Sequence, residues 1–202
     1  MKCYFFGTFN PIHSAHLEIA RKVREQFNFE DVIFVVAYAP PHKIPDTAPY
    51  DRLKMAQLAA GRKNVSDIEF FLPVPSYSYN TVLELKKRDK TERINFIMGY
   101  DAFFKIEGWK NPQILKDNVN FIIIPRRCSD NCEKSLSHLK ERGWKFEIAN
   151  IDFMNISSNM IRERLYENKD IEGLVEKKTR EYIYEHGLYR KQTQRMPERR
   201  EI

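Results

Sequence analysis

The chain has 202 residues, of which 42% are apolar and 13% are aromatic. This composition excludes a disordered chain and is sufficient for one good-sized domain with a single core. The formal net charge of +6 suits an anionic ligand, but it does not distinguish a nucleotide from a nucleic acid or a membrane surface.

Much of the positive excess lies in the polar end of the chain. We therefore expect a single domain over residues 1–189 and a basic, frayed tail over residues 190–202, which is not used as evidence for nucleic-acid binding. The three cysteines form an odd count, and we see no signal peptide and no apolar run long enough to cross a bilayer. These features predict a soluble, cytoplasmic protein that binds neither nucleic acid nor membrane.

Strand-like and helix-like patterns alternate along the chain. The first strand is expected at Lys2–Phe6, and a helical pattern begins near Ser14. Asp31–Ala37 carries an unbroken apolar run, which is typical of a strand buried on both faces of a parallel sheet. The remaining expected elements are a helix at Pro49–Gly61, a strand at Ile68–Leu72, a helix near Tyr79–Lys87, a strand at Ile94–Met98, a short helix after Asp101, a strand at Val119–Ile124 and two helices within Ser157–Tyr189.

This order of elements predicts an α/β fold of the Rossmann-like, doubly wound type. The sheet should be mostly parallel, with helices on both faces and a C-terminal helical segment. Ligands of such folds bind beyond the carboxyl ends of the strands. The loops expected at that edge are residues 7–16, 39–46, 99–109 and 125–128.

The loop Gly7–His16 reads GTFNPIHSAH and joins the first strand to the first helix. Gly7 has no Cβ and would let a phosphate approach the backbone closely. His13 and His16 would share one face of the first helical turn, where free N–H groups and the helix dipole attract anions. A solvated helix start or half of a metal site are the alternatives. Zinc would need a third ligand, which His42 could supply only through a tertiary contact.

A second candidate phosphate site is the segment ISSNMIRERL, Ile156–Leu165. Ser157 or Ser158 is suited to cap a helix, and Arg162 then falls about one turn into it. There its guanidinium could bind two phosphate oxygens at once, although a capped helix with an exposed arginine is the alternative. Lys43 lies in a loop with three prolines, which lower the entropy cost of holding it over a ligand.

The first loop is similar to the GxFxPxHxGH signature of the nucleotidyltransferase superfamily with the HIGH-type motif. It most resembles the bacterial nicotinate mononucleotide adenylyltransferases, and the resemblance covers nearly the whole chain. The other matching segments are Pro40–Lys43, Arg52–Met55, Ser76–Thr81, Gly99–Asp101 with Trp109, Ile156–Arg162 and Tyr182–Tyr189. The chain departs from the family pattern at Phe6, Asn10, Ala15 and Asn159, where Gly, Asp, Gly and Thr are usual.

The resemblance implies adenylyl transfer from ATP to nicotinate mononucleotide, with Mg²⁺ accompanying ATP. The nucleophile is a phosphate oxygen that is already ionised, so the site needs no general base. Catalytic roles are implied for His13, His16, Lys43 and Arg162. ATP would be bound by Gly7, Thr8, Phe9, His13, His16, Gly99, Asp101, Ile156, Ser157, Ser158 and Arg162. The acceptor would be bound by Lys43, Ser78, Thr81, Trp109 and Arg127, with Trp109 stacked on the nicotinate ring.

Several alternatives stay open at this point. The same reaction could use nicotinamide mononucleotide or phosphopantetheine, and the protein could instead be a nucleotide sensor without catalysis or a nucleic-acid-binding protein with a basic face. Cys128, Cys132 and His138 do not match the spacing or ligand number of a metal cluster, so we expect no protein-bound metal. A homo-oligomer is compatible with the sequence.

Overall fold

The computed structural model describes residues 1–125, 132–152 and 154–190. Its centre is a six-stranded sheet in the order β3-β2-β1-β4-β5-β6, and every pair of neighbouring strands is parallel. The strands are β1 (Lys2–Gly7), β2 (Asp31–Val36), β3 (Val65–Ser66), β4 (Ile94–Gly99), β5 (Val119–Ile124) and β6 (Phe146–Ile148). The predicted α/β, doubly wound fold is confirmed, with an entirely parallel sheet among the described residues.

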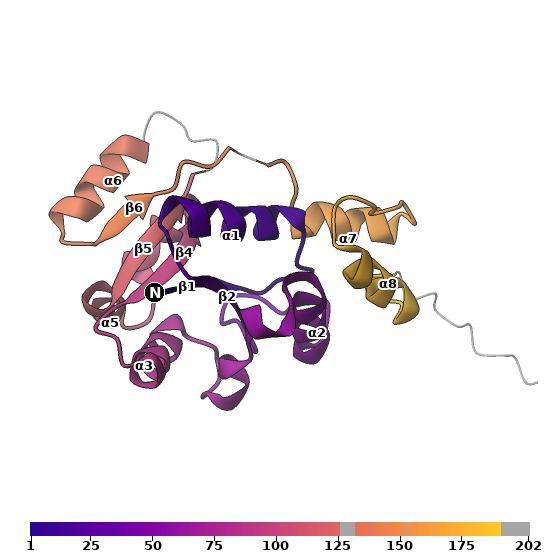
Figure 1. The fold of residues 1–202 in the computed structure, drawn as a ribbon, viewed down its shortest axis with the longest axis horizontal. Coiled ribbons are helices and arrows are strands. Elements are labelled where there is room, and N and C mark those ends of the chain that lie inside the picture. The colour runs from indigo at the N-terminus through magenta and orange to yellow at the C-terminus, as the bar shows by residue number, and fades with distance from the viewer. Residues whose placement is uncertain (126–131, 153, 191–202) are drawn as a thin grey trace, which may run out of the picture.

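Helices lie on both sides of this sheet (Figure 1). The α-helices are α1 (Ser14–Gln26), α2 (Pro49–Ala60), α3 (Ser78–Asp89), α4 (Tyr100–Phe103), α5 (Pro112–Asn118), α6 (Cys132–Glu141), α7 (Ser158–Tyr166) and α8 (Lys177–Glu185). Short 3-10 helices are η1 (Arg62–Asn64), η2 (Ile68–Phe71) and η3 (Ile106–Gly108). The expected C-terminal helical segment is α7 and α8. Apart from residue 190, the predicted tail 190–202 lies outside the described residues.

The predicted strand at Ile68–Leu72 is wrong. That run forms the 3-10 helix η2, whereas the strand at this edge is the two-residue β3, which pairs with β2 through Phe34 and Val35. A short apolar run cannot be assigned by periodicity alone, because strands and buried helical turns share it. Phe71, the last residue of η2, has its side chain 80% exposed to solvent, which a strand buried on both faces would not allow.

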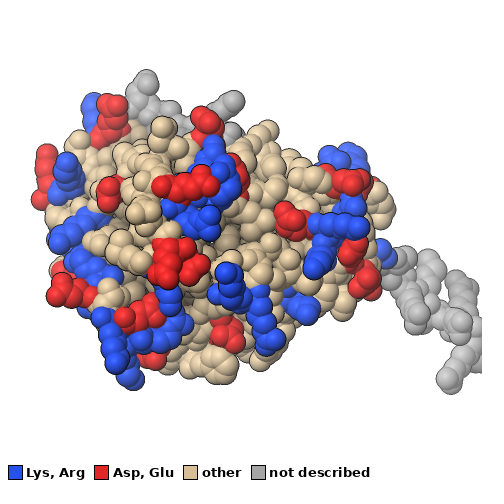
Figure 2. Space-filling view, viewed as in Figure 1, with Lys and Arg blue, Asp and Glu red and all other residues tan. Residues whose placement is uncertain are grey.

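The outer surface mixes both signs of charge. Figure 2 shows Lys and Arg interspersed with Asp and Glu over the face in view. On α1, for example, Arg21 bridges Glu18 at 2.6 Å and Glu25 at 2.7 Å. Such pairs of opposite charge one turn apart are typical of a solvated helix face. On the face in view, the described residues therefore alternate in sign of charge.

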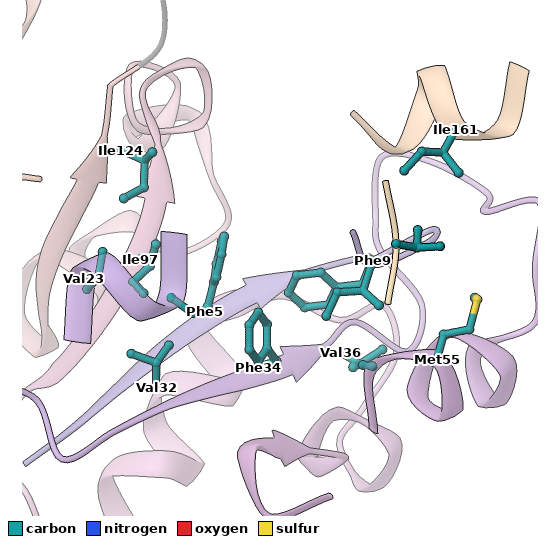
Figure 3. Close-up of a cluster of buried hydrophobic side chains, with 14 of the residues drawn as sticks. Phe5, Phe9, Val23, Val32, Phe34, Val36, Met55, Ile97, Ile124 and Ile161 are labelled. Carbon is teal, nitrogen blue, oxygen red and sulfur yellow. The ribbon is translucent and has the colours of Figure 1, made fainter. Parts of the chain in front are cut away.

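Alternate residues of the central strands pack into two separate hydrophobic clusters. From β1 and β2, Phe5 and Phe34 face the first cluster, whereas Tyr4 and Ile33 face the second. The first cluster also receives side chains from α1, α2 and α7, as Figure 3 shows for Ile161 of α7. Because the sheet is buried on both faces, its strands read as unbroken apolar runs. This explains why the sequence reveals them so clearly.

The strand order reverses between β1 and β4, which are neighbours in the sheet although far apart in sequence. Cys3 pairs with Asn95 and Phe5 with Ile97, so the same register brings Gly7 and Gly99 to adjacent strand ends. In doubly wound sheets this reversal opens a crevice at the carboxyl edge, where ligands bind.

The C-terminal helices are attached beside this edge. Thr179 of α8 donates a hydrogen bond to the carbonyl of Met55 in α2 at 3.2 Å, and Tyr182 donates to Asp51 at 2.7 Å. The backbone N–H of Ser14, at the start of α1, donates to Leu174 at 2.9 Å. These contacts place the N-terminus of α7 next to the first loop.

Candidate active site

The first loop turns sharply as it leaves β1. Phe9 has a left-handed backbone (φ 48°), and its ring packs against Phe5 and Phe34 with centroid distances of 5.8 and 5.5 Å. A Cβ atom on Gly7 would lie only 2.7 Å from Cζ of Phe9. The missing side chain of Gly7 therefore makes room for the Phe9 ring, and Gly7 also lines the wall of two cavities described below.

The two histidines of the loop form a stacked pair at the start of α1. His13 is the N-cap residue, and its ring lies 3.7 Å from that of His16 with an angle of 27° between the planes. The backbone N–H of His13 donates to Nδ1 of His16 at 3.2 Å. The neutral His16 ring therefore carries its proton on Nε2, which makes that atom a hydrogen-bond donor.

The N-terminus of α7 meets the same loop. Ser157 is the N-cap residue, as predicted, and its hydroxyl accepts a hydrogen bond from the backbone N–H of Met160 at 3.2 Å. The hydroxyl of Ser158 donates to the carbonyl of Pro11 at 2.8 Å. The N-terminus of α7 is thus fixed beside the histidine pair, and the positive end of its helix dipole favours anions.

Arg162, one turn into α7, is held by three different groups. Its guanidinium donates to the backbone carbonyl of Asn10 at 2.8 Å and to the side chain of Asn159 at 3.0 Å. Its Nε lies 2.8 Å from a carboxylate oxygen of Asp46, in the loop before α2. The Arg162 side chain is 20% exposed. One of its donors, Nε, is paired with the carboxylate of Asp46.

These groups share a polar cavity of about 450 Å³, which adjoins another of about 340 Å³. His16, Lys43, Ser158 and Arg162 line both cavities. Burial lowers the pKa of Lys43, and the positive charges of Arg162 and Arg52 lower it further. Two imidazoles, two cationic side chains and a helix N-terminus around one cavity are suited to a polyphosphate. Gly99, Ile156 and Ser157 complete the wall of the larger cavity.

A third cavity of about 240 Å³ lies beyond the ends of β1 and β4. Its wall is mainly apolar, and Trp109 and Ser78 line it from the segments after η3 and at the start of α3. Gly99 lines this cavity as well as the larger polar cavity. A cation-rich cavity and an aromatic cavity therefore meet at the end of β4, as a ligand with both a phosphate and a flat ring requires.

Comparison with known proteins identifies the family. The cytidylyltransferase-like family matches residues 4–164. A protein of Lachnoclostridium phytofermentans, named a probable nicotinate-nucleotide adenylyltransferase, is 31% identical over 192 residues, which cover 91% of this chain and 96% of the relative. The chain belongs to the nicotinate-nucleotide adenylyltransferase family. A relative with the same name in Clostridium botulinum strain Loch Maree is 32% identical over 198 residues, which cover 94% of this chain and 98% of that protein.

Solved structures agree with the fold of this family. The nicotinic acid mononucleotide adenylyltransferase of Plasmodium falciparum complexed with NaAD superimposes with a TM-score of 0.73 at 22% identity, covering 93% of this chain and 96% of that chain. The same enzyme complexed with APC gives a TM-score of 0.68 at 20% identity, with the same coverage. At such low identity these likenesses establish the shared architecture.

Three residues that we expected at the nucleotidyltransferase site do not line the described cavities or cannot be placed. A fourth, Phe9, packs its ring in the core but also lines the smaller polar cavity. Thr81 is 1% exposed and donates its hydroxyl to Glu69, so it lies behind the cavity wall rather than in it. Asp101 is exposed on α4 and lies outside the described walls of all three cavities. Arg127 lies outside the described residues.

The sequence predicted no role at this site for Asp46, Glu69 or Arg52, although Arg52 lies in a segment that matches the family. Asp46 pairs with Arg162, Glu69 lines the aromatic cavity, and Arg52 fixes the loops between them. Glu69 could have been noticed as the one acidic residue inside the apolar run Ile68–Leu72. The pairing of Asp46 had no sequence signal, because it depends on how two distant loops meet.

The structure also bears on metals and membranes. Among the described residues, no three His, Cys, Asp or Glu side chains are grouped closely enough to hold a metal ion. Cys128, considered above with Cys132 and His138, lies outside the described residues. Within the same parts of the chain, none of the helices has the length and apolar character needed to cross a membrane.

Proposed function

We propose that this chain transfers the adenylyl group of ATP to nicotinate mononucleotide, giving nicotinate adenine dinucleotide and pyrophosphate. The observation that carries this proposal is the meeting of the cation-rich cavity and the Trp109 cavity at Gly99. The names of the relatives, at 31 and 32% identity over nearly the whole chain, support the same acceptor.

In the proposed reaction, a phosphate oxygen of nicotinate mononucleotide attacks the α-phosphorus of ATP. The new P–O bond forms as the bond to pyrophosphate breaks, and pyrophosphate leaves with the electron pair. The attacking oxygen is already ionised near neutral pH, so the protein must mainly position two polyanions and stabilise charge. We assign the donor at Nε2 of His16, together with His13, Lys43 and Arg162, to the α-phosphate and the departing pyrophosphate.

The acceptor is assigned to the aromatic cavity. Trp109 would stack on the pyridine ring, and Ser78 at the N-terminus of α3 would lie near the ring carboxylate. Lys43 lines both polar cavities and would contact a phosphate there. Thr81 would act only indirectly, because it is covered by the cavity wall.

Mg²⁺ is proposed to arrive with ATP rather than to occupy a protein site. On the polar side, the carboxylate of Asp46 would reach such an ion by giving up its ion pair with Arg162. This donor set fits magnesium, which keeps several waters and usually takes one or two carboxylates together with substrate phosphates. When bound, the ion would neutralise charge on the phosphates.

The decisive experiment measures pyrophosphate release by the purified full-length chain with ATP, Mg²⁺ and one acceptor at a time. The acceptors are nicotinate mononucleotide, nicotinamide mononucleotide and phosphopantetheine. We expect the highest kcat/KM with nicotinate mononucleotide and formation of the dinucleotide in equal amounts to pyrophosphate. ATP binding without pyrophosphate release from any acceptor would instead indicate a nucleotide sensor, and a preference for either other acceptor would reassign the substrate.

A further inference from the structure

A buried carboxylate faces the aromatic cavity without a full set of partners. Glu69 is 4% exposed and lines the cavity together with Trp109 and Ser78. Its Oε1 accepts a hydrogen bond from the hydroxyl of Thr81 at 2.9 Å. Its Oε2 is buried and accepts no hydrogen bond from the described residues.

Such a group is costly to keep in a folded protein. Burial raises the pKa of the Glu69 carboxyl, and the hydroxyls of Thr81 and Ser76, the backbone N–H of Tyr38 and the charge of Arg52 oppose this effect. A buried polar atom without a partner lowers stability, and it calls for an explanation in a native structure. A cationic ligand in the cavity could compensate the charge of this carboxylate electrostatically.

A purely structural role explains Glu69 less well. Arg52 is the basic group whose charge acts on it, but the guanidinium of Arg52 donates to backbone carbonyls, including those of Thr8 and Tyr38. Glutamine has the same shape as glutamate and an oxygen that can accept the bond from Thr81. A role limited to holding Thr81 would therefore not require a negative charge.

The chemistry of the acceptor suggests what the charge is for. A pyridine mononucleotide carries a quaternary ring nitrogen, so its ring is a cation in the oxidised form. The cavity that holds Glu69 is mainly apolar, and an ion pair is strengthened where water is excluded. Tryptophan on the same wall is the aromatic residue that best attracts a cation across its face.

We propose that Glu69 is an acceptor-binding residue whose carboxylate is the counter-ion of the pyridinium ring of the substrate. The inference rests on the proposed function, because it takes the acceptor to be a pyridine mononucleotide in this cavity. It assigns to Glu69 the selection of cationic rings over neutral ones. Thr81, which holds Oε1, is then a positioning residue for Glu69.

The test is direct binding, measured by calorimetry with the full chain. Nicotinate mononucleotide and its 1,4-dihydro form are the two probes, because they share the ring carboxylate and differ in the ring charge. The variants are Glu69→Gln and, as a matched control, Glu92→Gln, which removes an exposed carboxylate before β4. The melting temperature and the dissociation constant of ATP are measured for each protein.

We expect Glu69→Gln to weaken binding of the oxidised probe at least about 30-fold, the lower end for removing one partner of a buried charge pair. Binding of the dihydro probe and of ATP should change less than about twofold, the melting temperature should not fall, and Glu92→Gln should match the wild type. Equal weakening of both probes, or a lower melting temperature without selectivity, would overturn the proposal.

The two proposals fail in different ways. In the first case, the wild type binds the oxidised probe, Glu69→Gln selectively weakens that binding, and no pyrophosphate is released. This result would refute the proposed reaction and support the counter-ion role of Glu69. If the wild type binds neither pyridine probe, both proposals fall. If pyrophosphate is released and Glu69→Gln binds both probes like the wild type, only the role of Glu69 is refuted.

Discussion

At the scale of single residues, Arg52 shows how a buried charge can stabilise loops rather than catalyse. It is 1% exposed, and its guanidinium donates to the carbonyls of Thr8, Ala37, Tyr38 and Thr47. We expect Arg52→Met to lower the free energy of unfolding by about 3 kcal/mol or more, because it leaves these carbonyls without a donor. Urea denaturation followed by circular dichroism measures the effect. An unchanged midpoint would show that water replaces the guanidinium.

His16 is the residue on which charge stabilisation is expected to depend most. The backbone N–H of His13 fixes its Nδ1, and this leaves Nε2 as the donor towards phosphate. We expect His16→Ala to lower kcat by about 10²–10³-fold, as for the loss of one preorganised electrostatic donor, with the fold intact by circular dichroism. His138→Ala on the exposed face of α6 is the matched control and should keep full activity. A wild-type rate in His16→Ala would contradict the assignment.

At the scale of elements, we expect the loop before α2 to compete with the nucleotide for Arg162 of α7. Asp46 holds Nε of Arg162 at 2.8 Å, and Asn10 approaches the same carboxylate with its amide at 3.5 Å. ATP phosphates would need the same donors of Arg162. The ion pair therefore opposes nucleotide binding in the ligand-free protein, unless Asp46 is retained for Mg²⁺.

We expect Asp46→Asn to lower the dissociation constant of ATP about two- to fivefold when Mg²⁺ is absent, the range set by one partly exposed ion pair. Asp117→Asn, at an exposed position of α5, serves as the control and should bind ATP like the wild type. Fluorescence titration with an ATP analogue gives both constants. Weaker binding by Asp46→Asn would mean that Asp46 positions Arg162 instead of competing for it.

At the scale of the whole molecule, the site depends on two ends of the chain coming together. Arg162 contacts Asn10 across 152 residues of sequence, and α8 attaches to α2 through Thr179. The sheet provides the rigid base, because its two hydrophobic clusters bury both faces of the strands. Such a scaffold can hold catalytic groups on its loops in precise positions, although each loop would be flexible by itself.

The buried strands could be predicted because each carries its own signal. β2 and β5 are continuous apolar runs, and their predicted bounds differ from the structure by at most one residue. The elements α5, α6 and β6 were not predicted. α5 and β6 are short, with seven and three residues, and two of the three residues of β6 are exposed, so no apolar periodicity marks that strand. α6 has 10 residues, with Leu136 and Leu139 buried three residues apart, so its helical pattern is present in the sequence.

The sequence by itself predicted the layered fold and a helix cap at Ser157 or Ser158, because the signals for both lie in residues that are close together in the chain. Only the tertiary structure decided that Asp46 meets Arg162, that Thr81 is covered and that Glu69 lines the aromatic cavity. The physical reason is that packing between distant segments sets side-chain partners and exposure, and no local pattern encodes which segments will meet.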